Sequence, residues 1–472
     1  MKNFTLLLSF LLLLTGAGQA QTFPVDTLIK SGPLSNRINI VFVGDGYQAT
    51  EMTKYLADVN RAVSAIFQEP PFSQYRQYFN VFAIRVPSAQ SGTTHPRTAA
   101  DCSTSSLPMG TATTYFSTRF DNTNIHRAIV TGGQGALGSV LANSFPQYTR
   151  AIVLANTAEY GGTGGASITI TANSAAPRVM IHEMGHTFGL LADEYWPGPI
   201  FAAEKPNLTQ PAVVSPLRWQ SWMGVGGVGN YPFAANEDPT WSRPHQSCTM
   251  RFSNSPFCSV CLEALIERIH AGARPVDSYA PISTTLANPV LPATFSLNLL
   301  RPNPNALRVI WKIDGTELRG NRNSATLRAG AGLFTGASHV IRAEVLDTTA
   351  LSHVTSGAHT ILHRTVVEWT VQRTTSGTKL TANSAEYKIE TFPNPVADVL
   401  NLSFTLPKAS DVRLVVVDAA GRRVKTLTKA RQAAGTYDYQ LRSEELGLRQ
   451  AGVYTLQVEI DGLLLSKQLV KE

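Results

Sequence analysis

The periodicity of the apolar residues changes near residue 280, and this change divides the chain into two kinds of structure. Before it, a β-branched run at residues 38–43 precedes a stretch of helical periodicity at 52–67, with Thr50 placed to cap that helix. Strands that alternate with helices are typical of an α/β layer structure, which we expect over residues 21–279. After residue 280, short strands separated by turns follow one another, which predicts all-β structure.

The strand-rich half is expected to contain two small sandwich domains. The first, at residues 280–375, has Trp311 and Trp369 available for its core. A polar, Ser- and Thr-rich stretch at residues 376–390 reads as a linker. The second all-β domain is expected at residues 391–472.

The first twenty residues have the order of a secretory signal peptide. Lys2 gives a positive start, residues 6–14 are largely apolar, and a run of small residues ends at Ala20. We therefore predict export of the mature chain. No later segment is apolar enough to cross a bilayer, so no transmembrane anchor is expected. The net charge of +7 is not gathered into runs, so no nucleic-acid partner is expected either.

The chain has four cysteines, at positions 102, 248, 258 and 261. In an oxidising compartment an even number favours disulfides, and four cysteines allow three pairings between which the sequence does not choose. An alternative interpretation is a structural zinc site. His245, Cys248, Cys258 and Cys261 have the ligand types and the clustering of such a site. We expect disulfides, with the zinc site as the alternative.

Two histidines with a glutamate between them, His182, Glu183 and His186, form the clearest chemical motif. Residues four apart on a helix share one face, so both imidazoles can reach a single tetrahedral ion. A Zn²⁺ ion bound there lowers the pKa of its water from about 15.7 to about 7. Glu183 can then take a proton during attack and pass it to the leaving amine. The pattern predicts a hydrolytic zinc site.

A third zinc ligand is needed, and the sequence offers several. In metzincins the motif continues through a glycine to a third histidine, but here Gly189 is followed by Ala192 at that position. A turn at Gly189 would let a carboxylate of the next residues return to the metal. We favour Asp193 as the third ligand, with Glu194 and the distant Glu263 as alternatives.

Residues further along the chain could complete such a site. Met250, between the cysteines, is placed like the methionine turn beneath a metzincin metal, although a single methionine is often only core filler. The glycine-rich stretch at residues 156–165 could form an edge that pairs with an extended peptide, or a plain loop. Tyr160, Tyr195 and Arg251 are candidate donors to a developing oxyanion.

The motifs together resemble the IgA-peptidase family of bacterial metallo-endopeptidases, over roughly residues 35–270. The matching stretches are residues 43–47 and 69–72, 182–195, and 248–251 with 257–261. The resemblance implies a zinc-dependent endopeptidase with His182, His186 and Glu183 at the family's motif positions. Cleavage of immunoglobulin A itself does not carry over, because nothing identifies residues that would recognise it.

The C-terminal domain is similar to the sorting domain of the type IX secretion system of Bacteroidetes. The matching residues are 392–395, 418–421, 452–454 and 467–471. The resemblance implies the type IX machinery as a partner, passage through the periplasm and across the outer membrane, and release or attachment at the cell surface.

The sequence therefore predicts a metzincin-like α/β catalytic domain followed by two small all-β sandwich domains. The predicted function is a secreted endopeptidase that hydrolyses protein or peptide substrates, with Zn²⁺ bound by His182, His186 and Asp193 and with Glu183 as general base and acid. Two other functions stay open. One is a surface adhesin or glycan-binding protein with a structural or vestigial zinc site, and the other is a zinc amidase that acts on cell-wall peptides.

Overall fold

The computed structural model describes residues 21–102, 109–353, 361–373 and 387–472. The predicted signal peptide at residues 1–20 and most of the predicted linker, residues 376–386, lie outside the described residues. The chain forms two compact units, Met1–Val371 and Gln372–Glu472, which are treated separately below. Among the described residues, strands far outnumber α-helices, of which there are four.

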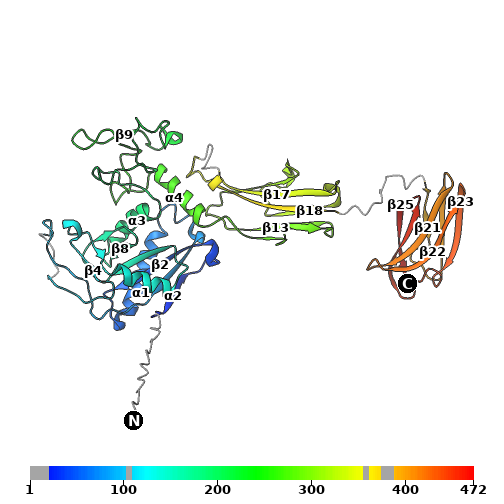
Figure 1. The fold of residues 1–472 in the computed structure, drawn as a ribbon, viewed down its shortest axis with the longest axis horizontal. Helices are drawn as coiled ribbons and strands as arrows, with labels where there is room; N and C mark the ends of the chain where they lie inside the picture. The colour runs from blue at the N-terminus through cyan, green and yellow to red at the C-terminus, as the bar shows by residue number, and fades with distance from the viewer. Residues whose placement is uncertain (1–20, 103–108, 354–360, 374–386) are drawn as a thin grey trace, which may run out of the picture. The chain divides into compact units, whose positions relative to one another are not determined.

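A six-stranded sheet, in the order β1-β3-β2-β6-β8-β7, organises the N-terminal part of the first unit (Figure 1). Its four central strands run parallel and its two edge strands run antiparallel to their neighbours. Every residue of β2 is buried, as expected for a central strand of a parallel sheet that is covered on both faces. The strands are β1 (Val25–Ile29), β2 (Ile38–Asp45), β3 (Phe79–Ile84), β6 (Arg150–Ala155), β7 (Gly162–Thr163) and β8 (Ile168–Thr171).

Helices cover both faces of this sheet. Ile40 and Phe42 of β2 share one hydrophobic core with α1 (Met52–Ile66), α3 (Ala176–Thr187) and α4 (Ser259–Gly272). Val41 and Val43 point to the opposite core, where α2 (Gln134–Ser144) packs. The alternation of side chains along β2 therefore produces three layers, helix–sheet–helix. The short strands β4 (Thr118–Arg119) and β5 (Val130–Thr131) form a pair, as do β9 (Tyr231–Pro232) and β10 (Ser242–Arg243).

The turn after β2 is held by a buried carboxylate. Asp45 is fully buried, and it accepts hydrogen bonds from the backbone N–H groups of Phe116 (2.8 Å) and Thr118 (2.9 Å) and from the hydroxyl of Thr114 (2.7 Å). It thus ties the segment before β4 to the end of the central strand. Gly46 follows with φ of 72°, a left-handed conformation that glycine adopts without strain.

The start of α1 differs from the prediction. Thr50 does not cap this helix. Instead, Gln48 and Glu51 form a reciprocal capping box at the 3-10 turn that leads into it, with the Gln48 N–H donating to the Glu51 carboxylate at 2.8 Å. The side chains of Gln48 and Glu51 thus each accept the free backbone N–H of the other residue.

The rest of the first unit is a β-sandwich, whose strands β13, β17 and β18 lie alongside one another in Figure 1. One sheet has the order β11-β13-β16 and the other β12-β18-β17-β14-β15. Trp311 and Trp369 are fully buried between them, with ring centroids 6.0 Å apart. The strands are β11 (Val276–Ala280), β12 (Thr285–Ala287), β13 (Ala293–Leu299), β14 (Leu307–Ile313), β15 (Thr316–Glu317), β16 (Thr326–Ala329), β17 (Ser338–Asp347) and β18 (Arg364–Gln372).

The second unit is also a two-sheet β structure. Its sheets have the orders β19-β20-β23 and β22-β21-β24-β25, and they enclose a separate hydrophobic core. The strands are β19 (Glu390–Phe392), β20 (Val399–Leu406), β21 (Ser410–Asp418), β22 (Arg423–Gln432), β23 (Gly435–Arg442), β24 (Gly452–Ile460) and β25 (Leu463–Lys471). In the part of the chain that the structure describes, no helix has the length and apolar character needed to span a membrane.

Candidate metal centre

Helix α3 presents both motif histidines on one face. Pro177 lies in its first turn, where a missing N–H costs no helical hydrogen bond, and Met180 and Met184 bury the opposite side. The Nε2 atoms of His182 and His186 lie 3.1 Å apart, and their rings are nearly perpendicular, at 85°. The two imidazoles therefore converge on one point.

The other nitrogen of each ring faces a backbone carbonyl. Nδ1 of His182 lies 2.8 Å from the carbonyl oxygen of Thr249, and Nδ1 of His186 lies 2.9 Å from that of Leu191. A carbonyl only accepts, so each Nδ1 carries the proton and each Nε2 presents a lone pair. Two facing lone pairs repel one another unless a cation lies between them.

A carboxylate completes the group. Oδ1 of Asp193 lies 3.1 Å from Nε2 of His182 and 3.2 Å from Nε2 of His186, and it is a buried atom without a hydrogen-bond partner among the described residues. Adjacent nitrogen and oxygen ligands of tetrahedral zinc lie about 3.3 Å apart, because each is about 2.0–2.2 Å from the ion. These three atoms therefore fit the ligand set of a zinc ion.

The charges within the group agree with a cation site. Burial raises the pKa of Asp193, but the two imidazoles outweigh burial and hold that pKa well below its usual range. Burial lowers the pKa of His186, but the Asp193 carboxylate more than offsets this and raises it to about 9. The carboxylate thus stays ionised and favours a positive charge against the rings, which is a proton on His186 unless a cation takes its place.

The turn that ends α3 places Asp193 beside the two histidines. The left-handed residue is Leu190, with φ of 56°, and not Gly189 as the sequence suggested. Leu191 N–H then donates to the Gly185 carbonyl at 3.0 Å, which closes the helix end in a Schellman-like turn. Gly189 is needed for a different reason: an added Cβ would lie 2.7 Å from the Gly185 carbonyl oxygen.

An asparagine that sequence reasoning missed fixes the segment after this turn. Asn207 is fully buried and clamps Ala192, donating to its carbonyl and accepting from its N–H, each at 2.8 Å. The other two candidate third ligands lie elsewhere. Glu194 points toward the cysteines, and Glu263 accepts hydrogen bonds from Trp222 at 2.7 Å and from two residues of the 352–353 segment.

Glu183 lies next to the converging atoms, under the glycine-rich stretch. An added Cβ on Gly164 would overlap its Oε2, so the backbone there approaches the carboxylate as closely as only glycine allows. Burial raises the pKa of Glu183, and the neighbouring imidazoles oppose this in part. A carboxyl group with a raised pKa is suited to both accepting and returning a proton.

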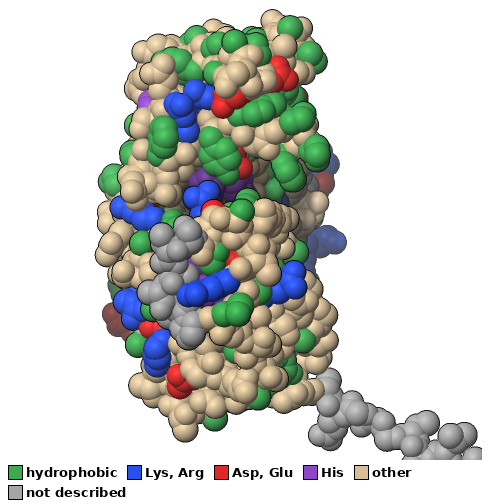
Figure 2. Space-filling view, turned by 90° about the vertical axis from the view of Figure 1, so that its left-hand side faces the viewer, with side chains coloured by type: hydrophobic (Ala, Val, Ile, Leu, Met, Phe, Trp, Pro, Cys, Tyr) green, Lys and Arg blue, Asp and Glu red, His purple; other side chains and the backbone are tan. Residues whose placement is uncertain are grey.

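A cavity of about 260 Å³ opens beside the group. Its lining includes Tyr160, Tyr195 and Arg251, the three candidate oxyanion donors, and also Arg127, which sequence reasoning missed. Burial and the Asp193 carboxylate raise the pKa of Tyr195, which therefore remains a proton donor. Figure 2 shows histidine side chains in a recess on this face, with basic side chains beside them. The remaining lining residues are Gly162, Val179, His182, Glu183 and Ser253.

Met250 lies beneath the helix that carries the histidines. It is fully buried, and an added Cβ on Gly185 would overlap its Sδ atom. Its carbonyl accepts the N–H of Glu194 at 2.8 Å, so the Met250 loop also supports the segment that carries Asp193. A role for Met250 beneath a bound metal stays a prediction.

The predicted disulfides are absent: all four cysteines, each of which lies among the described residues, are free. Cys248 and Cys261 come together, but their Sγ atoms are 3.7 Å apart, well beyond the bond length of about 2.05 Å in a disulfide. The alternative set with His245 is not formed either: His245 is not among the residues whose ligand atoms gather around these cysteines, and its Nδ1 accepts the N–H of Ser247. Glu194 lies with the three cysteines instead.

Comparison with known protein families agrees with the two resemblances. Residues 27–226 match the family model IgA Peptidase M64, and residues 390–472 match the secretion system C-terminal sorting domain. The M64 match ends before residues 248–261, which the sequence resemblance had included. The chain thus carries a peptidase domain and a sorting domain, and the latter indicates export to the cell surface or beyond it.

Solved structures resemble this chain only weakly. PorZ of Porphyromonas gingivalis is 14% identical over 24% of this chain and 14% of its own, with a TM-score of 0.13. Dimeric latent PorU of the same organism is 13% identical over 42% and 20%, with a TM-score of 0.16. Bacteroides uniformis beta-glucuronidase 3 is 8% identical over 49% and 28%, with a TM-score of 0.15. The chain spans less than a third of each, and no curated protein matches it.

Proposed function

We propose that this protein is an exported zinc metallo-endopeptidase with a metzincin-like catalytic domain. The observation that supports it is the convergence of three lone-pair atoms, Nε2 of His182, Nε2 of His186 and Oδ1 of Asp193, within 3.1–3.2 Å of one another. Such a set leaves one tetrahedral position open, which is the arrangement of catalytic rather than structural zinc. Residues 21–279 form the catalytic domain in this proposal, residues 280–375 an accessory sandwich, residues 376–390 a linker and residues 391–472 the sorting domain.

Each residue of the site has a distinct role. When bound, zinc supplies a Lewis acid and a water of lowered pKa. His182, His186 and Asp193 hold the ion, while the Thr249 and Leu191 carbonyls fix the tautomer of the two rings. Glu183 accepts a proton at its carboxylate as the scissile carbonyl is attacked and returns it to the leaving amine.

The cavity walls supply the charge complement. A peptide carbonyl gains negative charge as it becomes tetrahedral, and donors aimed at that oxygen lower the barrier. Such donors line the cavity: Arg127, Tyr160, Tyr195 and Arg251. An extended peptide would lie along the edge of the sheet near β7, whose Gly162 also lines the cavity.

The test is digestion of an unfolded, fluorescently labelled protein by the chain from residue 21 onward. We expect cleavage that a chelator abolishes and that added zinc restores. Glu183→Gln should keep the bound zinc and lose about 10²- to 10⁴-fold in kcat, the typical contribution of a general base. Near-normal turnover of this variant would refute the mechanism.

Two further substrates separate the alternative functions. Cleavage of cell-wall peptides without cleavage of the unfolded protein would indicate an amidase. Binding of glycans with no hydrolysis of either substrate, at full zinc occupancy, would indicate an adhesin with a vestigial site. Either outcome overturns the endopeptidase assignment.

A further inference from the structure

Three thiols and one carboxylate meet in the interior behind the histidine site. Cys248, Cys258, Cys261 and Glu194 each offer one ligand atom, and these four atoms all lie within 4.8 Å of one another. Glu194, Cys248 and Cys261 are fully buried, and Cys258 is 6% exposed. The cysteines come from the Met250 loop and the start of α4, whereas Glu194 comes from the segment after α3, so tertiary folding brings them together.

The spacing of these atoms fits a tetrahedral metal site better than a disulfide. With Zn–S near 2.3 Å and Zn–O near 2.0 Å, sulfur ligands lie about 3.8 Å apart and a sulfur and an oxygen about 3.5 Å apart. Here Cys248 and Cys261 Sγ are 3.7 Å apart, and Glu194 Oε1 lies 3.3 Å from Cys261 Sγ and 3.9 Å from Cys258 Sγ. A disulfide would also use only two of three thiols.

The carboxylate needs a positive partner. Oε1 of Glu194 accepts a hydrogen bond from Asn207 at 3.1 Å, but Oε2 is buried and has no hydrogen-bond partner among the described residues. Arg243 interacts with Glu194 only at longer range. A buried carboxylate beside three thiols is unfavourable without compensation. A divalent cation would neutralise it and would favour the thiolate form of the cysteines.

We propose that Glu194, Cys248, Cys258 and Cys261 bind a structural divalent metal ion, separate from the His182–His186 centre. Thiolate ligands and a closed four-ligand shell favour zinc in a structural role. The site deepens the proposed function, on which its consequence for catalysis rests. It would join the residue after Asp193 to the residue before Thr249, and Thr249 orients His182. The ion would therefore stabilise both the segment that carries Asp193 and the loop that orients His182.

The experiment measures bound metal by mass spectrometry of the elements, together with the near-ultraviolet thiolate-to-cobalt band of cobalt-substituted protein. Cys258→Ser should lose one equivalent of metal and most of this band. His182→Ala/His186→Ala should lose one equivalent and keep the band, which separates failure of this proposal from failure of the proposed function. Cys102→Ser removes the one cysteine outside this cluster and should keep most of the band, because the three thiolates of the cluster remain.

A measurement on the unchanged chain covers the case in which Cys258→Ser does not fold. After denaturation with a chelator, all four cysteines should react as free thiols, and the intact mass should show no loss of hydrogen. A disulfide between any two of Cys248, Cys258 and Cys261, or cobalt-loaded protein without the charge-transfer band, would overturn the proposal.

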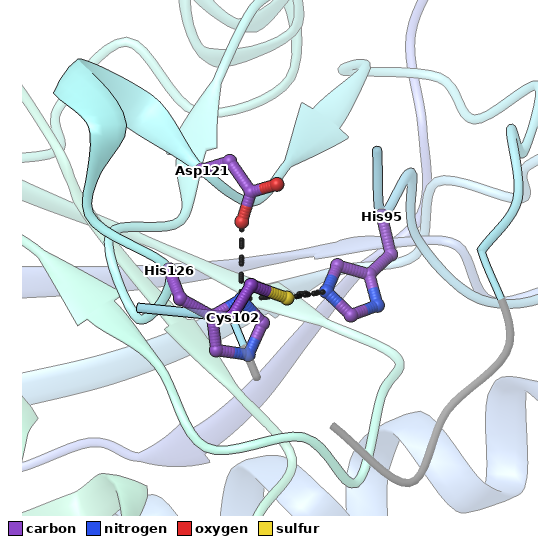
Figure 3. Close-up of side chains that lie close together, drawn as sticks. All are labelled: His95, Cys102, Asp121 and His126. Atoms are coloured by element: carbon purple, nitrogen blue, oxygen red, sulfur yellow. Dashed lines mark hydrogen bonds and ion pairs between the residues drawn. The ribbon is translucent and has the colours of Figure 1, made fainter. Parts of the chain in front are cut away.

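A second cluster supports an independent inference (Figure 3). The thiol of Cys102 and the rings of His95 and His126 face one another there, with the carboxylate of Asp121 beside His126. Nε2 of His95 lies 3.4 Å from Nδ1 of His126 and 3.5 Å from Cys102 Sγ, and Asp121 Oδ1 lies 3.0 Å from Nδ1 of His126. These distances are again close to the edges of a zinc tetrahedron, about 3.3–3.6 Å.

The surroundings of this cluster match a built site. Nε2 of His126 lies 3.3 Å from a carboxylate oxygen of Glu159, the carboxylate–histidine arrangement that leaves Nδ1 free to bind a metal. His95 is 3% exposed, and Asp121 adopts φ of 66°, a left-handed conformation held by the Thr98 N–H, which donates to its Oδ2 at 2.6 Å. We infer that His95, Cys102, Asp121 and His126 bind a further structural divalent ion.

This second ion would lie behind the cavity wall, because His126 precedes Arg127 and Glu159 precedes Tyr160, both of which line the cavity. His95→Ala/His126→Ala should lose one equivalent of metal while keeping the equivalents lost by Cys258→Ser and by His182→Ala/His186→Ala. Exchange of the backbone amides at residues 120–130 should also accelerate. Unchanged metal content in this double variant would refute the second site. The two sites together would use all four cysteines as ligands.

Discussion

The Nδ1 atom of His182 lies 2.8 Å from the carbonyl oxygen of Thr249. Thr249 follows Cys248 and precedes Met250, whose own carbonyl accepts the N–H of Glu194. One loop therefore orients a candidate zinc ligand on α3 and supports the segment that carries Asp193. Changes in the packing of this loop should reach the candidate metal centre without touching any of its candidate ligands.

Gly185→Ala tests this packing. In most helices alanine is more favourable than glycine by about 1 kcal/mol. Here the added methyl group would overlap Sδ of Met250, which is fully buried, and would lie 3.3 Å from Phe257. Overpacking should dominate, and we expect a net loss of about 1–3 kcal/mol in the free energy of unfolding, measured with urea, together with weaker zinc binding.

Gly138→Ala in α2 is the matched control. Nothing lies within 4 Å of the Cβ that this substitution adds. It should therefore stabilise the chain by about 0.5–1 kcal/mol, opposite in sign to Gly185→Ala. Equal effects of the two substitutions would contradict the packing argument.

Gly164→Ala should separate catalysis from folding. The atom that its Cβ would meet is Oε2 of Glu183, the end of a flexible side chain that can move at low cost to stability. Displacement of a catalytic group by about 1 Å can cost about 100-fold in rate. We expect kcat to fall by about that factor, with the melting temperature and the zinc content unchanged.

Gly165→Ala, one residue further on, provides the comparison. Its Cβ would meet only the Ser167 carbonyl, at the ordinary contact distance of 3.8 Å. Peptidase activity close to that of the unchanged chain is expected. If both glycine variants lose activity equally, flexibility of the loop rather than contact with Glu183 is responsible.

Asp193→Asn removes the negative charge and keeps the shape. Because the carboxylate lies against both imidazoles, its loss should weaken zinc binding at least about 100-fold, more than changes outside the ligand set commonly do. The measurement is the zinc concentration that restores activity to chelator-treated protein. An unchanged midpoint would show that another group serves as the third ligand.

The features that depend on residues close together in the sequence could be predicted from it. The helix at residues 52–66 follows from its periodicity, because burial of one face imposes it, and the strand that begins at residue 38 follows from its β-branched run. The His182–His186 spacing likewise indicates convergence on one face of a helix. Asp193 could be favoured only from ligand chemistry, and its role stays a prediction.

The remaining features depend on contacts between distant segments. Glu194 meets Cys261 across 67 residues, and Asn80 pairs with Asn39 across 41, so no local pattern marks either contact. The number of cysteines and the expected oxidising compartment suggested disulfides. Neither observation could reveal that folding brings the Glu194 carboxylate to three of these cysteines. Leu190 adopts the left-handed conformation, and Gly189 is needed instead for its close approach to the Gly185 carbonyl; both facts depend on the packed helix end.

Asp347 should make the stability of the first unit depend on pH. Fully buried at the end of β17, it lies 2.8 Å from Nε2 of His270 in α4 and accepts a hydrogen bond from the Tyr75 hydroxyl at 2.5 Å. It therefore links the sandwich strands to the layer that carries the candidate metal centre. Burial raises its pKa, but the hydrogen bonds and the charge of His270 outweigh burial and lower that pKa below the usual value.

A carboxyl group whose pKa is lower in the folded state contributes stability above its unfolded pKa, about 3.9 for aspartate, and loses it as pH falls through the folded value. Asp347→Asn should thus cost about 1–3 kcal/mol at neutral pH, because His270 and Tyr75 lose a charged acceptor. The difference in unfolding free energy between the two proteins, measured with urea, should shrink only below about pH 4. A difference that is constant from pH 7 to pH 3 would show that the ionised form of Asp347 contributes nothing.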